Sequence, residues 1–150
     1  GHVTDRMMLN GRQGRLHELQ ATRVAVEQAC TEAGIGISDL DFAEVHDCFT
    51  VNELLCAEAI GLSLPGRAGF DVMEGKFDPD GDCPINLSGG LKSKGHPVGA
   101  TGASMHALAY KQLTGAPIGV AAKGTPETAM TVNIGGSGVT NCVSVLRRIK

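Results

Sequence analysis

The order of helix-like and strand-like segments predicts a mixed α/β domain that forms one globular unit. Three segments carry apolar residues at helical spacing, and short apolar runs of strand length stand between them. The chain has 21 glycines in 150 residues, about twice the usual ~7%, and they mark turns between these segments. The last two strand-like runs are joined by glycines, which is typical of an antiparallel hairpin. We therefore expect a layered α/β fold.

The first predicted helix spans residues 15–33, and Gly34 supplies the left-handed residue that commonly ends a helix. Residues 1–14 are polar and punctuated by glycine, so we expect a flexible lead or an expression remnant there and the domain itself at 15–150. We expect no strand ahead of this helix. The apolar positions at helical spacing are Leu16, Leu19, Val26, Cys30 and Ala33.

A short strand at 40–45 runs directly into His46-Asp47-Cys48-Phe49, and a second helix is predicted over 51–60. Thr50 and Glu53 have the spacing of a capping box at the start of this helix. This order places residues 46–49 at the carboxyl end of a strand, beside a helix N-terminus. Open α/β sheets bind their ligands at such a position.

Residues 61–84 are rich in Gly, Pro and Asp and predict a long excursion, which in a compact domain is usually functional or disordered. A short apolar run at 85–87 and a glycine-rich segment at 88–102 follow. The third helix, at 100–114, has almost no polar side. A helix that is apolar nearly all round is typically buried on every side.

Two strand-like runs, 129–134 and 139–146, end the chain and are joined by 135–138. The successive backbone N–H groups of residues 133–138 can form a nest that binds an oxyanion. A plain hairpin turn is the alternative, and for this segment taken alone it is the commoner case.

Composition excludes several classes of protein. The formal charge is −3, from 13 basic and 16 acidic residues, and aromatic residues make up 3% of the chain, whereas a nucleic-acid surface needs clustered positive charge and stacking rings. No apolar stretch approaches the ~20 residues that cross a bilayer, so we expect a cytoplasmic protein. Five cysteines without a CxxC pair predict free thiols rather than a disulfide framework or a metal site.

The segment His46-Asp47-Cys48 places an imidazole, a carboxylate and a thiol within three residues. The dipole and free N–H groups of a helix N-terminus favour a thiolate there, which makes the segment a candidate for nucleophilic or acid–base chemistry. The alternative is structural, with a buried thiol and an Asp that caps a helix.

His96 lies between glycines, is followed by Pro97, and stands at the entry to the third helix, where it can act as a base or hydrogen-bond donor. A histidine that only caps the helix is the alternative. Residues 90–95 have the glycine spacing of a phosphate loop, but His96 and Pro97 replace the Lys and Ser/Thr such a loop needs. Residues 78–82 resemble a calcium loop only superficially, because Gly89 replaces the bidentate Glu.

Three motifs together resemble the C-terminal half of a thiolase over residues 15–148. They are HDCF at 46–49, GHPVGATG at 95–102 and NIGGSG at 133–138, in the family's order and spacing. Most thiolases have Asn-Glu-Ala-Phe at the first motif and Cys at Asn133, and both departures resemble the sterol-carrier-protein type. The resemblance implies a thiolase-like half domain, with a mixed sheet, helices on both faces and a C-terminal antiparallel hairpin.

The resemblance also implies an acyltransferase that performs reversible Claisen chemistry on a 3-oxoacyl-CoA, with the coenzyme A thioester as substrate and no covalently bound cofactor or metal. Carried over by motif, His96 activates the nucleophile or donates to an oxyanion, and His46 helps to hold an oxyanion contact. Cys48 is then the acid/base, and the N–H of Gly135 lines the second oxyanion hole.

The family's acyl-accepting Cys lies in an N-terminal half, and none of the five cysteines here stands in that motif. We therefore expect the chain alone to be inactive, and its apolar third helix to be covered by an N-terminal half or by self-association. Two alternatives stay open: a non-catalytic thiolase-like module that binds acyl-CoA or a partner, and a retro-aldolase subunit for steroid side chains. The retained His46, Cys48 and His96 argue against the first, and the retained Cys48 and His96 argue against the second.

Overall fold

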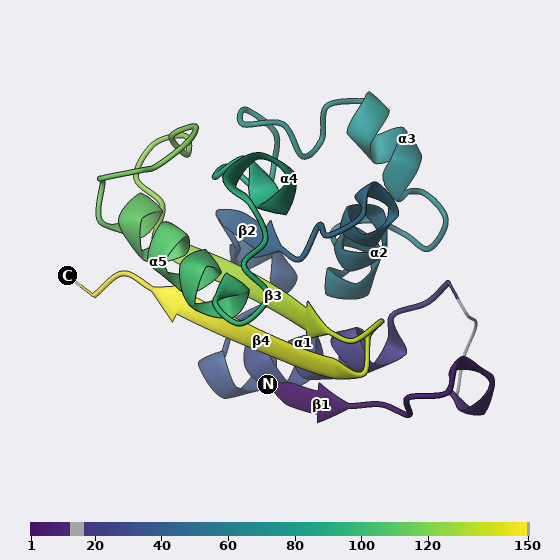
Figure 1. Ribbon diagram of the computed structural model, residues 1–150. Helices are drawn as coiled ribbons and strands as arrows, with labels where there is room; N and C mark the ends of the chain where they lie inside the picture. The colour runs from purple at the N-terminus through teal and green to yellow at the C-terminus, as the bar shows by residue number, and fades with distance from the viewer. Residues whose placement is uncertain (13–16, 150) are drawn as a thin grey trace.

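The computed structural model describes residues 1–12 and 17–149, and it contains a mixed four-stranded sheet in the order β1-β4-β3-β2 with helices on both faces (Figure 1). The strands are β1 (His2–Thr4), β2 (Phe42–Val45), β3 (Thr128–Gly135) and β4 (Thr140–Arg147). The α-helices are α1 (Gln20–Ala33), α2 (Thr50–Ile60), α3 (Ala68–Met73), α4 (Gly90–Lys94) and α5 (Thr101–Leu113). Strands β2 and β3 are parallel, and the other pairs are antiparallel. The predicted α/β class and the C-terminal hairpin are confirmed.

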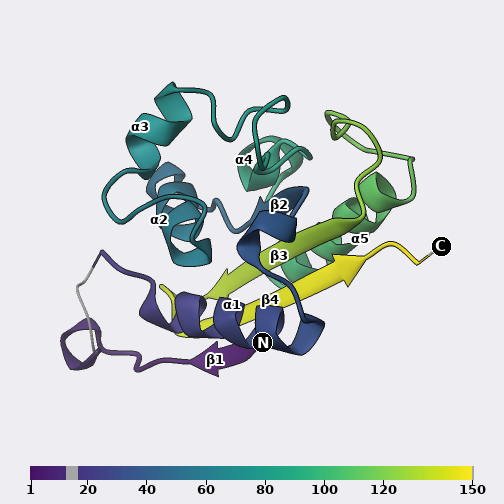
Figure 2. The same ribbon diagram turned by 180° about the vertical axis from the view of Figure 1, so that it is seen from behind.

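The two faces of the sheet carry separate cores. Helices α1 and α2 lie over one face and α5 over the other, as the two opposite views show (Figures 1 and 2). On β2, Ala43 and Val45 pack into the larger core on the α1 side, whereas Phe42 packs into the smaller core under α5. Because side chains alternate along a strand, Glu44 and the following His46 are directed to the α5 face.

Helix α1 begins later than predicted. The structure starts it at Gln20, with Leu19 at the capping position and no side-chain hydrogen bond to fix an earlier start. Residues 17–19 are not helical, and residues 15 and 16 of the predicted helix lie outside the described residues. The apolar pattern in the sequence includes Leu19, which precedes the helix, because this side chain also packs against the larger core. The predicted stop is confirmed, since Gly34 is left-handed with φ 66°.

The expectation of no strand ahead of the first helix is wrong. Residues 2–4 form β1, which pairs antiparallel with β4 and places Val3 opposite Asn141. The Thr22 hydroxyl donates to Asn141 Oδ1 at 2.7 Å, and Asn141 Nδ2 donates to the Val3 carbonyl at 3.3 Å. Only the central residue of this three-residue strand is partly buried, so the strand leaves no alternating pattern in the sequence.

The predicted second helix is confirmed, but its predicted capping box is not formed. Phe49 occupies the capping position in extended conformation, and Thr50 is the first helical residue. The Glu53 carboxylate instead accepts a hydrogen bond from Asn86 Nδ2 at 3.4 Å. Asn86 also ties the glycine-rich segment to β2, because its Oδ1 accepts the Val45 N–H at 2.8 Å.

Helix α5 is buried on one side only, which corrects the expectation of a helix buried all round. Met105, Ala109 and Leu113 face the sheet and are at most 4% exposed. The opposite side carries small residues and Tyr110, which is 62% exposed. The sheet covers a single side of the helix, and no other described element covers the outer one.

Candidate active site

The site forms where the two parallel strands end. Val45 of β2 stands opposite Val132 of β3, so the next residues, His46 and Asn133, lie side by side at one edge of the sheet. Both are directed to the α5 face by strand alternation. His46 Nδ1 is 3.0 Å from Asn133 Oδ1, and the His46 side chain is buried. The predicted position of His46 beyond a strand's carboxyl end is confirmed.

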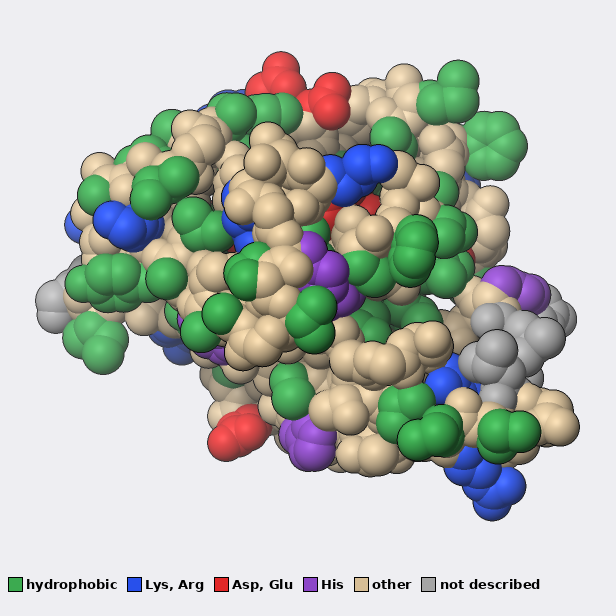
Figure 3. All heavy atoms as spheres, viewed as in Figure 1, with side chains coloured by type: hydrophobic (Ala, Val, Ile, Leu, Met, Phe, Trp, Pro, Cys, Tyr) green, Lys and Arg blue, Asp and Glu red, His purple; other side chains and the backbone are tan. Residues whose placement is uncertain are grey.

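A second imidazole meets the first. The rings of His46 and His96 have centroids 4.9 Å apart and an interplanar angle of 85°, an edge-to-face contact. His96 lies on the exposed segment 95–100 that joins α4 to α5. Histidine side chains reach the surface near the middle of this side of the molecule (Figure 3). The structure therefore brings two of the predicted site residues together from segments 50 positions apart.

His46 is arranged as a neutral imidazole. Burial lowers its pKa, the nearby His96 lowers it further, and the hydrogen bond to Asn133 opposes these effects. Asn133 Oδ1 can only accept, so His46 Nδ1 carries the hydrogen and Nε2 keeps a lone pair. Neutral His46 thus presents a hydrogen-bond acceptor to the site.

The depressed pKa of His46 predicts a loss of stability in mild acid. The unfolded chain binds a proton near the ordinary histidine pKa of about 6.5, while folded His46 does so only at lower pH. The contribution of His46 to the free energy of unfolding is therefore complete above about pH 6.5 and is lost as the pH falls toward the pKa of the folded state. The total loss is about 1.4 kcal/mol for each unit by which the two pKa values differ. Urea unfolding between about pH 7.5 and pH 5 measures this slope.

The matched control is His46→Gln, which removes this group and leaves the other histidines in place. Its pH slope should be smaller than that of the parent chain over the same range. Equal slopes in the two proteins would contradict the depressed pKa.

Asp47 has a structural place in this site. Its buried carboxylate accepts the Leu91 N–H at 2.7 Å, at the start of α4. Gly90 adopts φ 62°, and a Cβ there would lie 2.1 Å from Asp47 Oδ2. The alternative of a capping Asp is therefore observed, although the helix it caps is α4 and not α2. Because α4 leads into the segment of His96, Asp47 connects the two histidine segments.

Glu44 was not singled out by the sequence. It is 1% exposed, and its carboxylate accepts the Ser88 N–H at 3.0 Å and the Ser88 hydroxyl at 2.5 Å. Burial raises its pKa, and the two hydrogen bonds from Ser88 oppose this rise. A single acid within an otherwise apolar strand is the signal that could have revealed it, because such a side chain must find partners when it is buried.

Cys48 lies two residues after His46, and Gly135 lies two residues after Asn133. Neither makes a side-chain hydrogen bond to His46 or His96 within the described residues. Cys48 is half-buried, just beyond β2. Gly135 is exposed at the end of β3, opposite Thr140. All five cysteines are free, and burial raises the pKa of Cys83 to about 12.

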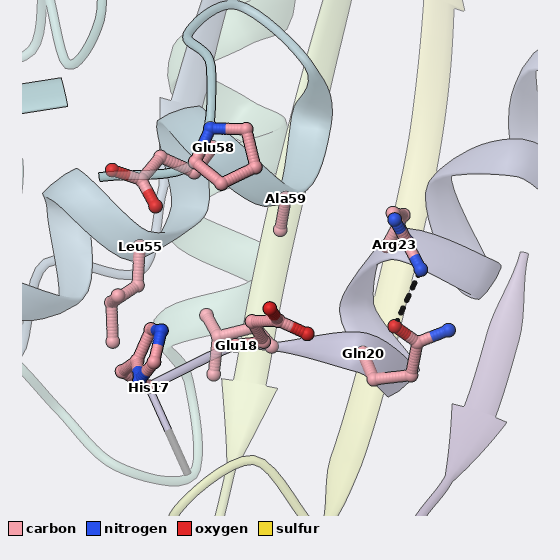
Figure 4. A pocket seen from close by; sticks show the side chains of 9 residues that line it. His17, Glu18, Gln20, Arg23, Leu55, Glu58 and Ala59 are labelled. Carbon is pink, nitrogen blue, oxygen red and sulfur yellow. Dashed lines mark hydrogen bonds between the residues drawn. The ribbon is translucent and has the colours of Figure 1, made fainter. Parts of the chain in front are cut away.

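A separate small cavity of about 60 Å³ lies between the start of α1 and α2 (Figure 4). Its lining includes His17 and Glu58, and at its edge Arg23 Nη2 donates to Gln20 Oε1 at 2.6 Å. It contains none of the predicted site residues. The described residues also contain no cluster of three or more His, Cys, Asp or Glu that could hold a metal ion, and no helix long and apolar enough to cross a membrane.

A mixed sheet with helices on both faces, and histidines gathered where its parallel strands end, defines a thiolase-like domain. The model of the family described as thiolase C-terminal domain-like matches residues 1–148, and the chain belongs to this family.

Known proteins similar to this chain agree with that assignment. The acetyl-CoA acetyltransferase of Methanothermobacter thermautotrophicus is 41% identical over 130 residues, which are 87% of this chain and 34% of that protein. Sterol carrier protein 2 of Rattus norvegicus is 46% identical over 94 residues, or 63% of this chain and 17% of that protein. The match to the solved structure described as "Ltp2-ChsH2(DUF35) aldolase" covers 100% of this chain and 38% of the matched chain, with a TM-score of 0.81 and 19% sequence identity. This similarity supports the fold. The chain thus spans about a third of the acetyltransferase.

Proposed function

We propose that this chain supplies the acid–base and oxyanion-binding groups of a thiolase active site, for acyl transfer on a 3-oxoacyl-CoA. The observation that carries the proposal is the contact of His46, just beyond the end of β2, with His96 from the segment between α4 and α5, with ring centroids 4.9 Å apart. Claisen chemistry needs a base of near-neutral pKa and donors directed at a developing oxyanion. Two adjacent imidazoles, one held by Asn133 and the other by buried Thr101, can supply such a base and such a donor.

Each site residue has a role in this proposal. His96 takes the proton of the attacking thiol or donates to an oxyanion, since its ring is exposed to an incoming group. Neutral His46 accepts a hydrogen bond from a water, whose second O–H then donates to the other oxyanion. Cys48 moves the proton at the α-carbon, and the N–H of Gly135 completes the second oxyanion hole.

The proposal places the acyl-accepting thiol outside these 150 residues. Cys56 and Cys83 are buried, with raised pKa values, and a nucleophilic cysteine needs an accessible thiolate. The outer side of α5 exposes two alanines and Tyr110, with Lys111 beside them. We propose that this side packs against the segment that bears the nucleophile or against a second copy of the chain.

A complementation assay tests the proposed function. The 150-residue chain alone should show no 3-oxoacyl-CoA thiolysis, because the acyl acceptor is missing. Addition of a separately produced N-terminal part of the Methanothermobacter acetyltransferase, which this chain does not match, should give turnover. The measurement is the release of acetyl-CoA.

The control for complementation is the His96→Gln chain, which should give no more turnover than the N-terminal part alone. Robust turnover by the unmodified chain without any addition would refute the missing nucleophile. Binding of acyl-CoA to the chain without turnover under complementation would favour a non-catalytic binding module instead.

A further inference from the structure

His96 is held in place without being buried. All six residues of segment 95–100 are exposed, and exposed segments with few packing contacts are usually the least ordered part of a fold. The ring nevertheless lies edge-on to buried His46. Hydrogen bonds must therefore position it, and the buried end of this segment is Thr101, which is 1% exposed at the start of α5.

The Thr101 hydroxyl contacts two groups at once. Its Oγ1 lies 2.9 Å from the Pro97 carbonyl oxygen and 2.7 Å from His96 Nδ1. A hydroxyl has one hydrogen and two lone pairs, and a carbonyl oxygen can only accept. The hydroxyl hydrogen therefore points to Pro97, and His96 Nδ1 must donate to Oγ1. A neutral His96 then carries its lone pair on Nε2.

A second pair of hydrogen bonds closes the same segment from its other end. Lys94 Nζ, on the last residue of α4, donates to Ser104 Oγ at 3.1 Å. The Ser104 hydroxyl in turn donates to the Thr101 carbonyl oxygen at 2.9 Å. The residues before and after the exposed segment are thus joined across the first turn of α5, which restricts where the backbone of His96 can lie.

We propose that Thr101 is a positioning residue that fixes His96 in the tautomer with hydrogen on Nδ1, so that Nε2 is the nitrogen that exchanges a proton. The role of that exchange rests on the proposed function. The thiol of the attacking cysteine gives its proton to Nε2, which leaves a thiolate and an imidazolium with hydrogen on both nitrogens. The Nδ1–H stays bonded to Thr101, and Nε2 later returns the proton to a leaving group.

Nitrogen NMR of the histidine side chains in the ¹⁵N-labelled 150-residue chain tests the tautomer directly. At about pH 8, His96 should show a protonated Nδ1 and an unprotonated Nε2, as its hydrogen bond to Thr101 Oγ1 requires. The His96→Gln variant assigns the signals. Thr101→Val, which keeps the side-chain shape, should lose the single tautomer, and Thr101→Ser, which keeps the hydroxyl, should retain it.

If the unmodified chain carries the hydrogen of neutral His96 on Nε2, the proposal is overturned. This measurement does not depend on whether any variant folds. An unchanged tautomer in folded Thr101→Val overturns it as well. The readout does not depend on turnover, so a chain with the expected tautomer that fails in complementation contradicts the proposed function alone. In complementation, Thr101→Val should lower turnover at least about tenfold, which is less than the about 10²- to 10⁴-fold contributed by a proton-transfer group itself, and Thr101→Ser should restore most of it.

Discussion

Cys48→Ala is expected to lower the turnover of the complete enzyme by about 10²- to 10⁴-fold, the contribution typical of a positioned proton-transfer group. The same change should cost only about 1 kcal/mol of stability, because Cys48 is half-buried and accepts or donates no hydrogen bond within the described residues. Thiolysis rates after complementation measure the first effect. Urea unfolding of the 150-residue chain measures the second.

Two other cysteines provide controls for this prediction. Cys142 is exposed on β4, so Cys142→Ala should leave stability nearly unchanged. Cys56 is completely buried in the larger core, so Cys56→Ala should lower stability more than Cys48→Ala does. If Cys48→Ala lowered stability as much as Cys56→Ala and left turnover intact, Cys48 would be a structural thiol and not a proton-transfer group.

The position of His46 could be predicted because its signals are local. A short apolar strand, a helix immediately after it and a glycine that ends that helix all lie within 22 residues. Strand alternation then determines which face of the sheet the side chain occupies. The structure agrees on each point, since β2 ends at Val45 and α2 ends before left-handed Gly61.

The partners of His46 and His96 could not be predicted in the same way. Asn133 meets His46 only because β2 pairs with β3 in one register, and that pairing joins residues 87 positions apart. Nothing in the local pattern selects a register when both strands are buried on both faces. The motif at 133–138 marks Asn133 as a departure from the thiolase pattern, but no local feature of the sequence predicts its hydrogen bond to His46. The three-residue β1 was missed for the related reason that its pairing is distant.

The glycines of this chain have different physical roles. Gly34 and Gly61 provide left-handed helix ends with open space around them or only a distant neighbour. Gly102 lies against Asn133, where a Cβ would be 2.9 Å from Nδ2. Gly90 combines both demands, because its φ is positive and its Cα faces the Asp47 carboxylate. Composition reveals the number of glycines, whereas only the packing separates these roles.

Gly90→Ala is expected to lower the free energy of unfolding by about 3 kcal/mol or more. A left-handed alanine costs about 1 to 2 kcal/mol in backbone strain. The new Cβ would lie 2.1 Å from Asp47 Oδ2, so the carboxylate must move from the Leu91 N–H that it accepts at 2.7 Å. Loss of a buried hydrogen bond to a charged group costs about 1.5 to 3 kcal/mol more. Urea unfolding at neutral pH measures the sum.

Gly34→Ala separates the two contributions, because Gly34 has nearly the same backbone angle, φ 66° against 62°, and a Cβ added there would have no neighbour within 4 Å. Gly34→Ala should lower the free energy of unfolding only by the cost of backbone strain. The additional decrease in Gly90→Ala measures the effect of the contact with Asp47. The same displacement should weaken the hold on α4 and therefore on His96, so Gly90→Ala should also broaden the His96 ring signals while Gly34→Ala leaves them sharp. Equal losses in the two variants would show that Asp47 yields without cost, and α4 would then not depend on it.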